Sequence, residues 1–222
     1  MHAMTHELKT PLTSIRLYLE TLQSGKISSS KTDEIYNKMI ADCDRLDEMV
    51  DDVLGASRLD SINSKMDLSE IDLSNNLNDF LDGFENNIRQ QNGVLKREID
   101  NGVIIRANSD ELNRAIKTVI ENGLKYSPPD RKNLEVKLTD HKNHASITIT
   151  DSGFGIKSGE LKNIFDRFYR ISNSKTETIK GTGLGLFIAA QIIKAHHGTI
   201  KAQSAGLDKG TTFIIELPMV TK

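Results

Sequence analysis

The stretch that decides the fold of the second half of the chain is Ala145-Ser146-Ile147-Thr148-Ile149-Thr150-Asp151-Ser152-Gly153-Phe154-Gly155-Ile156. Its first six residues alternate between apolar and polar side chains, which predicts a strand with one buried face. A carboxylate and two glycines follow directly. An ionised carboxylate only accepts hydrogen bonds, and glycine lets a ligand come close to the backbone. The stretch therefore predicts either a site for a hydrogen-bond-donating ligand at the end of the strand or a simple turn between a strand and a helix.

A second glycine cluster lies further along the chain, in Gly181-Thr182-Gly183-Leu184-Gly185-Leu186. It opens an apolar stretch, residues 184–195, that we expect to be a helix. Backbone N–H groups and the dipole at a helix N-terminus favour a phosphate group. The spacing differs from the dinucleotide-binding fingerprint, and the Lys-Ser/Thr ending of a P-loop is missing. Taken alone, the cluster also fits a flexible hinge.

A third group of polar residues ends the helix predicted for residues 110–126, which stops before Pro128-Pro129. Asn122 and Lys125 are three residues apart and share one helical face. An amide oxygen can complete the coordination of Mg²⁺ that is shared with phosphates and water. A lysine can neutralise phosphate charge, and Tyr126 offers a ring for stacking on a base. The alternative is a solvated helix end whose lysine interacts with the helix dipole.

The first part of the chain carries two apolar stripes with helical spacing. The first contains Leu8, Leu12, Ile15, Leu19 and Leu22, and the second contains Ile35, Met39, Cys43, Leu46, Val50, Val53 and Leu54. Steps of three and four residues are typical of the seam of a coiled coil or a helical hairpin. One hairpin leaves a face of its seam exposed, so we expect a homodimer that covers it. We also expect Cys43 to lie in the core.

The order of elements predicts two domains. We place a helical hairpin in residues 1–60, a linker in the polar residues 61–70, and a second domain in residues 71–222. In the second domain we expect helices at 72–89, 110–126 and 184–195, and strands at 94–99, 103–105, 134–138, 145–150, 199–202 and 212–217. This order predicts an α+β domain with antiparallel strands late in the chain and helices on one face of the sheet.

Composition excludes several functional classes. Of the 222 residues, 37% are hydrophobic and 27% charged, which is enough apolar material for a globular core. The formal charge of −2 gives no basic footprint for nucleic acid. A single cysteine fits a reducing compartment, and no apolar run approaches the roughly 20 residues of a membrane span. We expect a cytoplasmic chain that itself contacts neither nucleic acid nor membrane.

Together the motifs resemble a known family. The helix with Asn122, the motif at Asp151, the segment Ile164-Phe165-Asp166-Arg167-Phe168-Tyr169-Arg170 and the second glycine cluster follow the order of the N, G1, F and G2 boxes of sensor histidine kinases. Gly210-Thr211-Thr212-Phe213 resembles the last nucleotide-side motif of that fold, and Thr5-His6-Glu7-Leu8-Lys9-Thr10-Pro11-Leu12 resembles the H box. The resemblance implies an α-helical hairpin that forms a dimeric four-helix bundle, followed by an α+β sandwich ATP-binding domain of Bergerat type.

The resemblance also implies a reaction. A phosphoryl group from ATP is expected on His6, and from there on an aspartate in the receiver domain of a response regulator. Imidazole is a suitable nucleophile near neutral pH. Glu7 is expected to orient the ring of His6, and Thr10 to position a water for a phosphatase reaction on the regulator.

For the nucleotide, the resemblance implies ATP and Mg²⁺ as cofactors, with the metal on Asn122 and the adenine on Asp151. Arg167 or Arg170 is expected to supply a cation near the γ-phosphate, and residues 157–180 to form a lid. The other residues expected to bind the nucleotide are Lys125, Tyr126, Gly153, Gly155, Ile156, Gly181, Thr182, Gly183, Leu184, Gly185, Leu186, Thr211 and Thr212.

Some residues depart from the family pattern. Thr118 stands where the N box usually carries a second asparagine, which puts Mg²⁺ affinity in question, and Gly123 replaces the usual alanine. His6 lies so near the first residue that we expect a fragment of a longer, membrane-anchored sensor. Two other functions are alternatives: a dimeric ATP-binding scaffold with decayed kinase activity, and a related ATPase, which needs a carboxylate to activate water. The position of Glu121, next to Asn122, does not favour the ATPase, and the H box argues against it most strongly.

Overall fold

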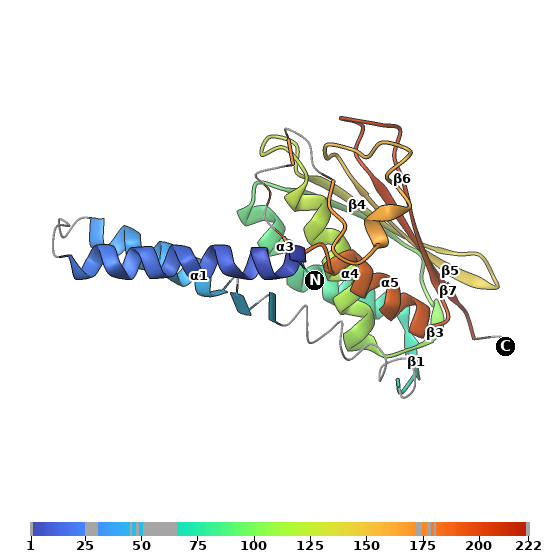
Figure 1. The fold of residues 1–222 in the computed structure, drawn as a ribbon. Helices are drawn as coiled ribbons and strands as arrows, with labels where there is room; N and C mark the ends of the chain where they lie inside the picture. Colours follow the sequence, from blue (N-terminus) through green and yellow to red (C-terminus); the bar gives the residue numbers. More distant parts are fainter. Residues whose placement is uncertain are drawn as a thin grey trace. The chain divides into compact units, whose positions relative to one another are not determined.

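The computed structural model describes residues 2–24, 31–44, 46–47, 49–50, 66–171, 175–176, 179 and 181–220. It divides the chain into two units, residues 1–58 and residues 59–222. In the first unit, α1 spans His2–Gln23 with Pro11 inside it, and residues 31–44 are helical too. Figure 1 shows the second helical stretch lying alongside α1, which is the predicted hairpin. None of the helices in the described residues combines the length and the hydropathy that a membrane span requires.

The seam of the hairpin is exposed at several positions in the single chain. Leu12 and Leu19 from the first stripe are 59% and 52% exposed, and Val50 from the second is 48% exposed. Cys43 is exposed as well, so the prediction that it lies in the core is wrong. Two helices are too few to enclose both faces of an apolar seam.

The second unit is built on a five-stranded sheet with the order β2-β4-β5-β7-β6. Its strands are β2 (Val94–Ile99), β4 (Asn133–Asp140), β5 (His144–Asp151), β6 (Thr199–Gln203) and β7 (Thr212–Pro218). The four late strands pair antiparallel, as predicted. The edge strand β2 runs parallel to β4, because helix α4 (Ser109–Lys125) crosses over between them.

A separate two-stranded antiparallel ribbon joins β1 (Ser69–Asp72) to β3 (Ile104–Ala107). The sequence prediction assigned residues 69–70 to the linker, whereas the structure places them in β1. Four residues are too few to show an alternating pattern, and the strand exists because β3 supplies its hydrogen-bond partners.

Three helices, α3 (Leu73–Gln90), α4 and α5 (Gly185–Ala195), lie on one face of the sheet (Figure 1). Each of the first two begins at a capping side chain: Asp72 accepts from the backbone N of Asn75 at 3.0 Å, and Asn108 accepts from that of Glu111 at 3.1 Å. The residues that fill the layer between helices and sheet are fully buried and include Leu77, Leu81, Leu112, Ile116, Val119, Ile120, Val136, Ile147, Ile192 and Ile215.

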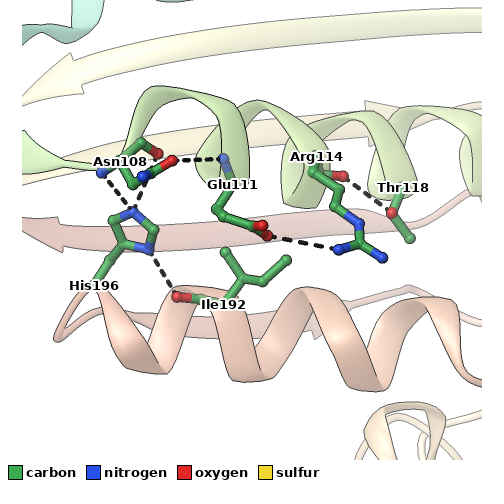
Figure 2. Close-up of polar contacts among 6 residues, drawn as sticks. All are labelled: Asn108, Glu111, Arg114, Thr118, Ile192 and His196. Atoms are coloured by element: carbon green, nitrogen blue, oxygen red, sulfur yellow. Dashed lines mark hydrogen bonds and ion pairs between the residues drawn. The ribbon is translucent and has the colours of Figure 1, made fainter. Parts of the chain in front are cut away.

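The side chain of His196 forms hydrogen bonds that link the end of α5 to the start of α4 (Figure 2). The residue is 1% exposed. Nε2 lies 3.1 Å from the backbone N of Asn108, and Nδ1 lies 2.8 Å from the carbonyl oxygen of Ile192. A backbone N–H only donates, so Nε2 is the acceptor and Nδ1 carries the proton donated to Ile192. This bridge connects the C-terminal end of α5 to the N-terminal end of α4.

Candidate nucleotide-binding site

The centre of the candidate site is the carboxyl group of Asp151, at the end of β5, where the residue is 8% exposed. Oδ1 accepts a hydrogen bond from the backbone N of Gly153 at 2.7 Å and another from that of Thr211 at 3.0 Å. Burial raises the pKa of this carboxyl group to about 6, because desolvation outweighs the two N–H donors that stabilise the charged form. Since Oδ1 has two donors already, Oδ2 is the oxygen left to bind a ligand.

Glycines let the backbone close tightly around this carboxyl group. A Cβ atom at Gly153 would lie 2.6 Å from the carbonyl oxygen of Tyr126 and 2.7 Å from Oδ1 of Asp151. Gly210 has a φ of +70°, and a Cβ atom there would collide with the carbonyl oxygen of Asp151. A side chain at either position would therefore push the end of β5 away from its neighbours.

The last turn of α4 lies beside the carboxyl group of Asp151 and the loop that follows it. The backbone N of Phe154 donates to the carbonyl oxygen of Tyr126, the C-cap residue of α4, at 2.9 Å. A Cβ atom at Gly123 would lie 3.2 Å from Cβ of Asp151 and 2.8 Å from Cδ2 of Leu134. The glycine that departs from the family pattern thus has a packing reason, because α4 lies in close contact with β4 and β5 there.

The second glycine cluster lies at the end of α4 as well. A Cβ atom at Gly181 would lie 2.9 Å from Nζ of Lys125, so the ammonium group borders the start of the cluster. Asn122, one turn earlier on the same helix, is half-buried. Helix α5 begins at Gly185, and its N-cap, Leu184, has no side chain that could accept the first N–H groups. These N–H groups suit a phosphate beside the lysine.

The segment between the glycine motifs supports the cluster. The backbone N of Phe168 donates to the carbonyl oxygen of Gly183 at 3.0 Å. The guanidinium of Arg167 lies 4.6 Å from the centre of the Phe187 ring, and a nitrogen of Arg170 donates to the carbonyl oxygen of Ile179 at 2.6 Å. Both arginines have partners within the protein, and their role at the γ-phosphate stays a prediction.

Several other predicted residues have definite places. Thr211 is buried, and the hydroxyl of Thr212 lies 3.0 Å from that of Thr150 on the neighbouring strand. Thr10 is exposed on α1. His6 and Glu7 lie in α1, and their side chains fall outside the described part of the chain.

Thr118, which replaces the usual asparagine, faces α5. Its hydroxyl donates to the carbonyl oxygen of Arg114 at 3.0 Å, within its own helix (Figure 2). Its methyl carbon would lie 3.1 Å from a Cβ atom at Gly185. Thr118 is thus a packing residue between the helices, which leaves Asn122 as the amide side chain of this helix turn.

Sequence reasoning missed Ser204. Its hydroxyl accepts from the backbone N of Ile156 at 3.0 Å and donates to the carbonyl oxygen of Gly210 at 2.7 Å. The available signal was a serine two residues beyond the strand predicted at 199–202, in a loop that contains two glycines.

Comparison with known families decides the identity of the fold. Residues 107–221 match the histidine kinase-, DNA gyrase B- and HSP90-like ATPase family, and residues 1–62 match the His Kinase A (phospho-acceptor) domain. This chain belongs to the sensor histidine kinases.

The histidine kinase is similar to longer sensors. It is 30% identical over 217 residues to the sensor histidine kinase WalK of Bacillus subtilis (strain 168), which covers 97% of this chain and 35% of that protein. It is 32% identical over 221 residues to a sensor protein kinase WalK of Staphylococcus aureus, which covers 97% of this chain and 52% of that protein. The chain thus spans 35% to 52% of the length of these relatives.

Solved histidine kinases share the fold. The histidine kinase ThkA, in complex with the response regulator protein TrrA, aligns with a TM-score of 0.79 at 20% identity over 98% of this chain and 60% of that one. Acinetobacter baumannii AdeS aligns with a TM-score of 0.76 at 21% identity over 96% of this chain and 98% of that one. Full-length ShkA, in complex with AMPPNP, aligns with a TM-score of 0.71 at 20% identity over 98% of this chain and 45% of that one.

Proposed function

We propose that this kinase transfers the γ-phosphoryl group of ATP to a ring nitrogen of His6 and then to an aspartate in the receiver domain of a response regulator. The observation that carries the proposal is the meeting of three sequence motifs. The Phe154 N–H donates to the carbonyl oxygen of Tyr126 at 2.9 Å, and Lys125 borders Gly181. A carboxylate, a lysine and an uncapped helix N-terminus in one place match the adenine and phosphate ends of one nucleotide.

In the proposed complex, the exocyclic amine of adenine donates to Oδ2 of Asp151. The phosphates lie between Lys125 and the start of α5, where a cation and backbone N–H groups neutralise their charge. Catalysis of phosphoryl transfer consists mainly of such positioning and charge stabilisation.

The residues of the site fit Mg²⁺ as the metal. The described residues contain no cluster of three or more His, Cys, Asp or Glu side chains able to hold an ion. Mg²⁺ usually keeps several waters and takes one or two protein ligands beside substrate phosphates, so the amide oxygen of Asn122 suffices as a protein ligand. When bound, Mg²⁺ neutralises charge on the phosphates during transfer.

In the first step a ring nitrogen of His6 attacks the γ-phosphorus, the bond to the β,γ-bridging oxygen breaks, and ADP leaves with that electron pair. Glu7 accepts the hydrogen bond of the other ring nitrogen and stabilises the positive charge that forms. In the second step a carboxylate oxygen of the regulator attacks the phosphorus, and the N–P bond breaks. In a separate phosphatase reaction, Thr10 positions a water that attacks the phosphorus of the aspartyl phosphate, the bond to the aspartate oxygen breaks, and inorganic phosphate leaves.

The kinase is proposed to act as a homodimer. Leu12 and Leu19, which lie one above the other on α1, are more than half exposed in the single chain. Pairing with the same seam of a second copy removes this apolar surface from water and forms a four-helix bundle. That the solved structure of ThkA contains a response regulator protein supports a regulator as the second partner.

The test is incubation of the purified protein with γ-labelled ATP and Mg²⁺, scoring label that is acid-labile and base-stable. His6→Gln should abolish the label, whereas the control His141→Gln, in the exposed turn between β4 and β5, should retain it. ATP binding without any label on the parent would contradict the kinase proposal and favour an ATP-binding scaffold.

A further inference from the structure

One hydroxyl group closes the loop between β6 and β7. Ser204 Oγ accepts from the backbone N of Ile156 at 3.0 Å and from that of Gly206 at 3.3 Å. Two carbonyl oxygens lie within reach of its proton, that of Gly210 at 2.7 Å and that of Gly206 at 3.2 Å, and it donates to the nearer one, Gly210. One donor and two acceptors use the whole capacity of a hydroxyl group. Ser204 therefore joins both ends of its own loop to the loop that follows Asp151.

The bond from Ser204 acts on Asp151 through a single peptide unit. The carbonyl of Gly210 and the N–H of Thr211 belong to the same planar, rigid group. The carbonyl end accepts from Ser204, and the N–H end donates to Oδ1 of Asp151 at 3.0 Å. A hydroxyl that fixes one end fixes the direction of the other. It also polarises the amide, which strengthens the N–H as a donor.

The surroundings leave this peptide unit little freedom. Gly210 adopts a φ of +70° against the carbonyl oxygen of Asp151, a place that no residue with a Cβ atom could take. Its own N–H donates to the carbonyl oxygen of Gly153 at 3.1 Å, and the N–H of Asp208 donates to that of Phe154 at 2.7 Å. The two loops thus form one hydrogen-bonded frame around the carboxyl group.

We propose that Ser204 is a positioning residue for the nucleotide base: it aims the Thr211 N–H at Oδ1 of Asp151 and leaves Oδ2 to receive the amine of adenine. The inference rests on the proposed function, in which Asp151 binds adenine. Ser204 acts through the Gly210–Thr211 peptide and needs no contact of its own with the nucleotide.

Loss of the Ser204 hydroxyl has a definite electrostatic consequence. Burial raises the pKa of Asp151 to about 6, and the hydrogen bond from the Thr211 N–H acts in the opposite direction because it stabilises the ionised carboxylate. A weaker or misdirected N–H opposes the effect of burial less, so the pKa rises further. The charged groups of neighbouring elements, Lys125 at the end of α4 and the ion pair of Lys175 with Asp208, are not among the causes of this shift. A change in the hydrogen bond should therefore show directly in the titration.

The experiment follows the amide proton of Thr211 by NMR through a pH titration without nucleotide. In the parent protein, this proton should titrate with a midpoint near the pKa of Asp151, about 6. In Ser204→Ala the midpoint should rise by about half a unit or more, and the resonance should move upfield as its bond weakens. The amide of Gly153, which donates to the same oxygen, should report the same midpoint. Gln203→Ala, at the exposed neighbouring residue, should change nothing.

ATP binding, measured by calorimetry on the same proteins, forms the second arm. A rise of half a unit halves the ionised fraction near pH 6, so Ser204→Ala should bind ATP about twofold more weakly there and nearly as well as the parent at pH 8. An unchanged Thr211 midpoint, or an equal loss of affinity at every pH, would overturn the inference. Should the alanine variant not fold, Ser204→Cys replaces the hydroxyl by a weak donor and should give a smaller rise of the midpoint.

The two arms separate the two proposals. In one outcome, the midpoint of the Thr211 titration moves in Ser204→Ala, but the ATP affinity of the parent does not depend on pH near 6. This outcome would refute adenine binding by Asp151 and with it the role of Ser204 in base recognition. A midpoint that stays fixed while parent affinity falls below pH 6 would refute only the role of Ser204.

Discussion

Replacing Asp151 by asparagine should stabilise the protein and remove nucleotide binding at the same time. The carboxyl group is 8% exposed, and burial raises its pKa from 3.8 to about 6. One pKa unit corresponds to about 1.4 kcal/mol, so the buried charge costs about 3 kcal/mol of folding free energy at neutral pH. Asparagine keeps an oxygen in the place of Oδ1 for the N–H groups of Gly153 and Thr211, and it carries no charge.

The sign of the pH dependence follows from the direction of the shift. Between the unfolded pKa of 3.8 and the folded pKa of about 6, the folded state holds more protons than the unfolded state. The stability of the parent is therefore highest below this window and falls as pH rises through it. The advantage of Asp151→Asn should be absent near pH 4 and fully present above pH 7.

Thermal unfolding of the complete chain, followed by calorimetry from pH 4 to pH 8, measures this advantage. A gain of up to about 3 kcal/mol raises the Tm of a unit of this size by roughly 6 to 12 °C. Circular dichroism gives a second record, since the chain has no tryptophan for fluorescence. In the binding assay, the amide NH₂ takes the place of Oδ2 and faces the amine of adenine, so ATP affinity should fall roughly 100-fold.

The control is Asp151→Ala, which removes the charge and also the acceptor. It leaves the N–H groups of Gly153 and Thr211 without a partner, so it should be less stable than the asparagine variant by about 1 to 3 kcal/mol. The electrostatic reasoning would be refuted if the asparagine variant were less stable than the parent at pH 7. It would also be refuted if the stability advantage of this variant were the same at pH 4 and pH 7. Retained ATP affinity would refute the assignment of Asp151 to adenine.

Three further predictions test packing, helix docking and the lid. Gly153→Ala should lower the free energy of unfolding by about 2 kcal/mol or more and abolish ATP binding, because its Cβ atom would lie 2.6 Å from a carbonyl oxygen. The control Gly83→Ala, in α3 with open space around it, should raise the free energy of unfolding by up to about 1 kcal/mol in thermal unfolding. His196→Phe should lower the free energy of unfolding by about 2 kcal/mol in the same assay, since the backbone N–H of Asn108 loses its partner, with ATP affinity unchanged in the folded protein. Asp208→Asn breaks an ion pair with Lys175 of the predicted lid at 2.6 Å and should speed dissociation of a fluorescent ATP analogue up to about fivefold at low salt. The double variant with the two charges exchanged, Asp208→Lys with Lys175→Asp, should restore slow dissociation. A dissociation rate that does not depend on ionic strength would contradict a role of this ion pair in holding the lid.

The elements that sequence predicted well are those with strong local patterns. Helix α4 carries buried apolar residues at helical spacing, a capping asparagine before its first turn and two prolines beyond its end. Strand β5 alternates because one face of the sheet meets the helices. The sequence also predicted the nucleotide motifs, since their carboxylate, amide, lysine and glycine residues suit the chemistry of one ligand, and that assignment stays a prediction.

The elements that sequence missed depend on partners far away in the chain. Strand β1 has four residues, and its pairing with β3 involves residues more than thirty positions later. The parallel placement of β2 follows from a helix that crosses over to β4. Cys43 lies on an apolar stripe and was predicted to be buried, but spacing along one helix cannot say whether a second copy of the chain covers that stripe.

The sequence by itself determined the two kinds of unit and the order of most helices and strands, because these depend on patterns within a few turns or strands. It also predicted which residues bind a nucleotide. Only the tertiary structure decided how the carboxyl group of Asp151 behaves. Its burial, its raised pKa and its bond from Thr211, sixty positions away, depend on residues that the fold brings to the end of β5 from elsewhere in the chain. Desolvation and hydrogen-bond direction are properties of the folded surroundings, and no local pattern encodes them.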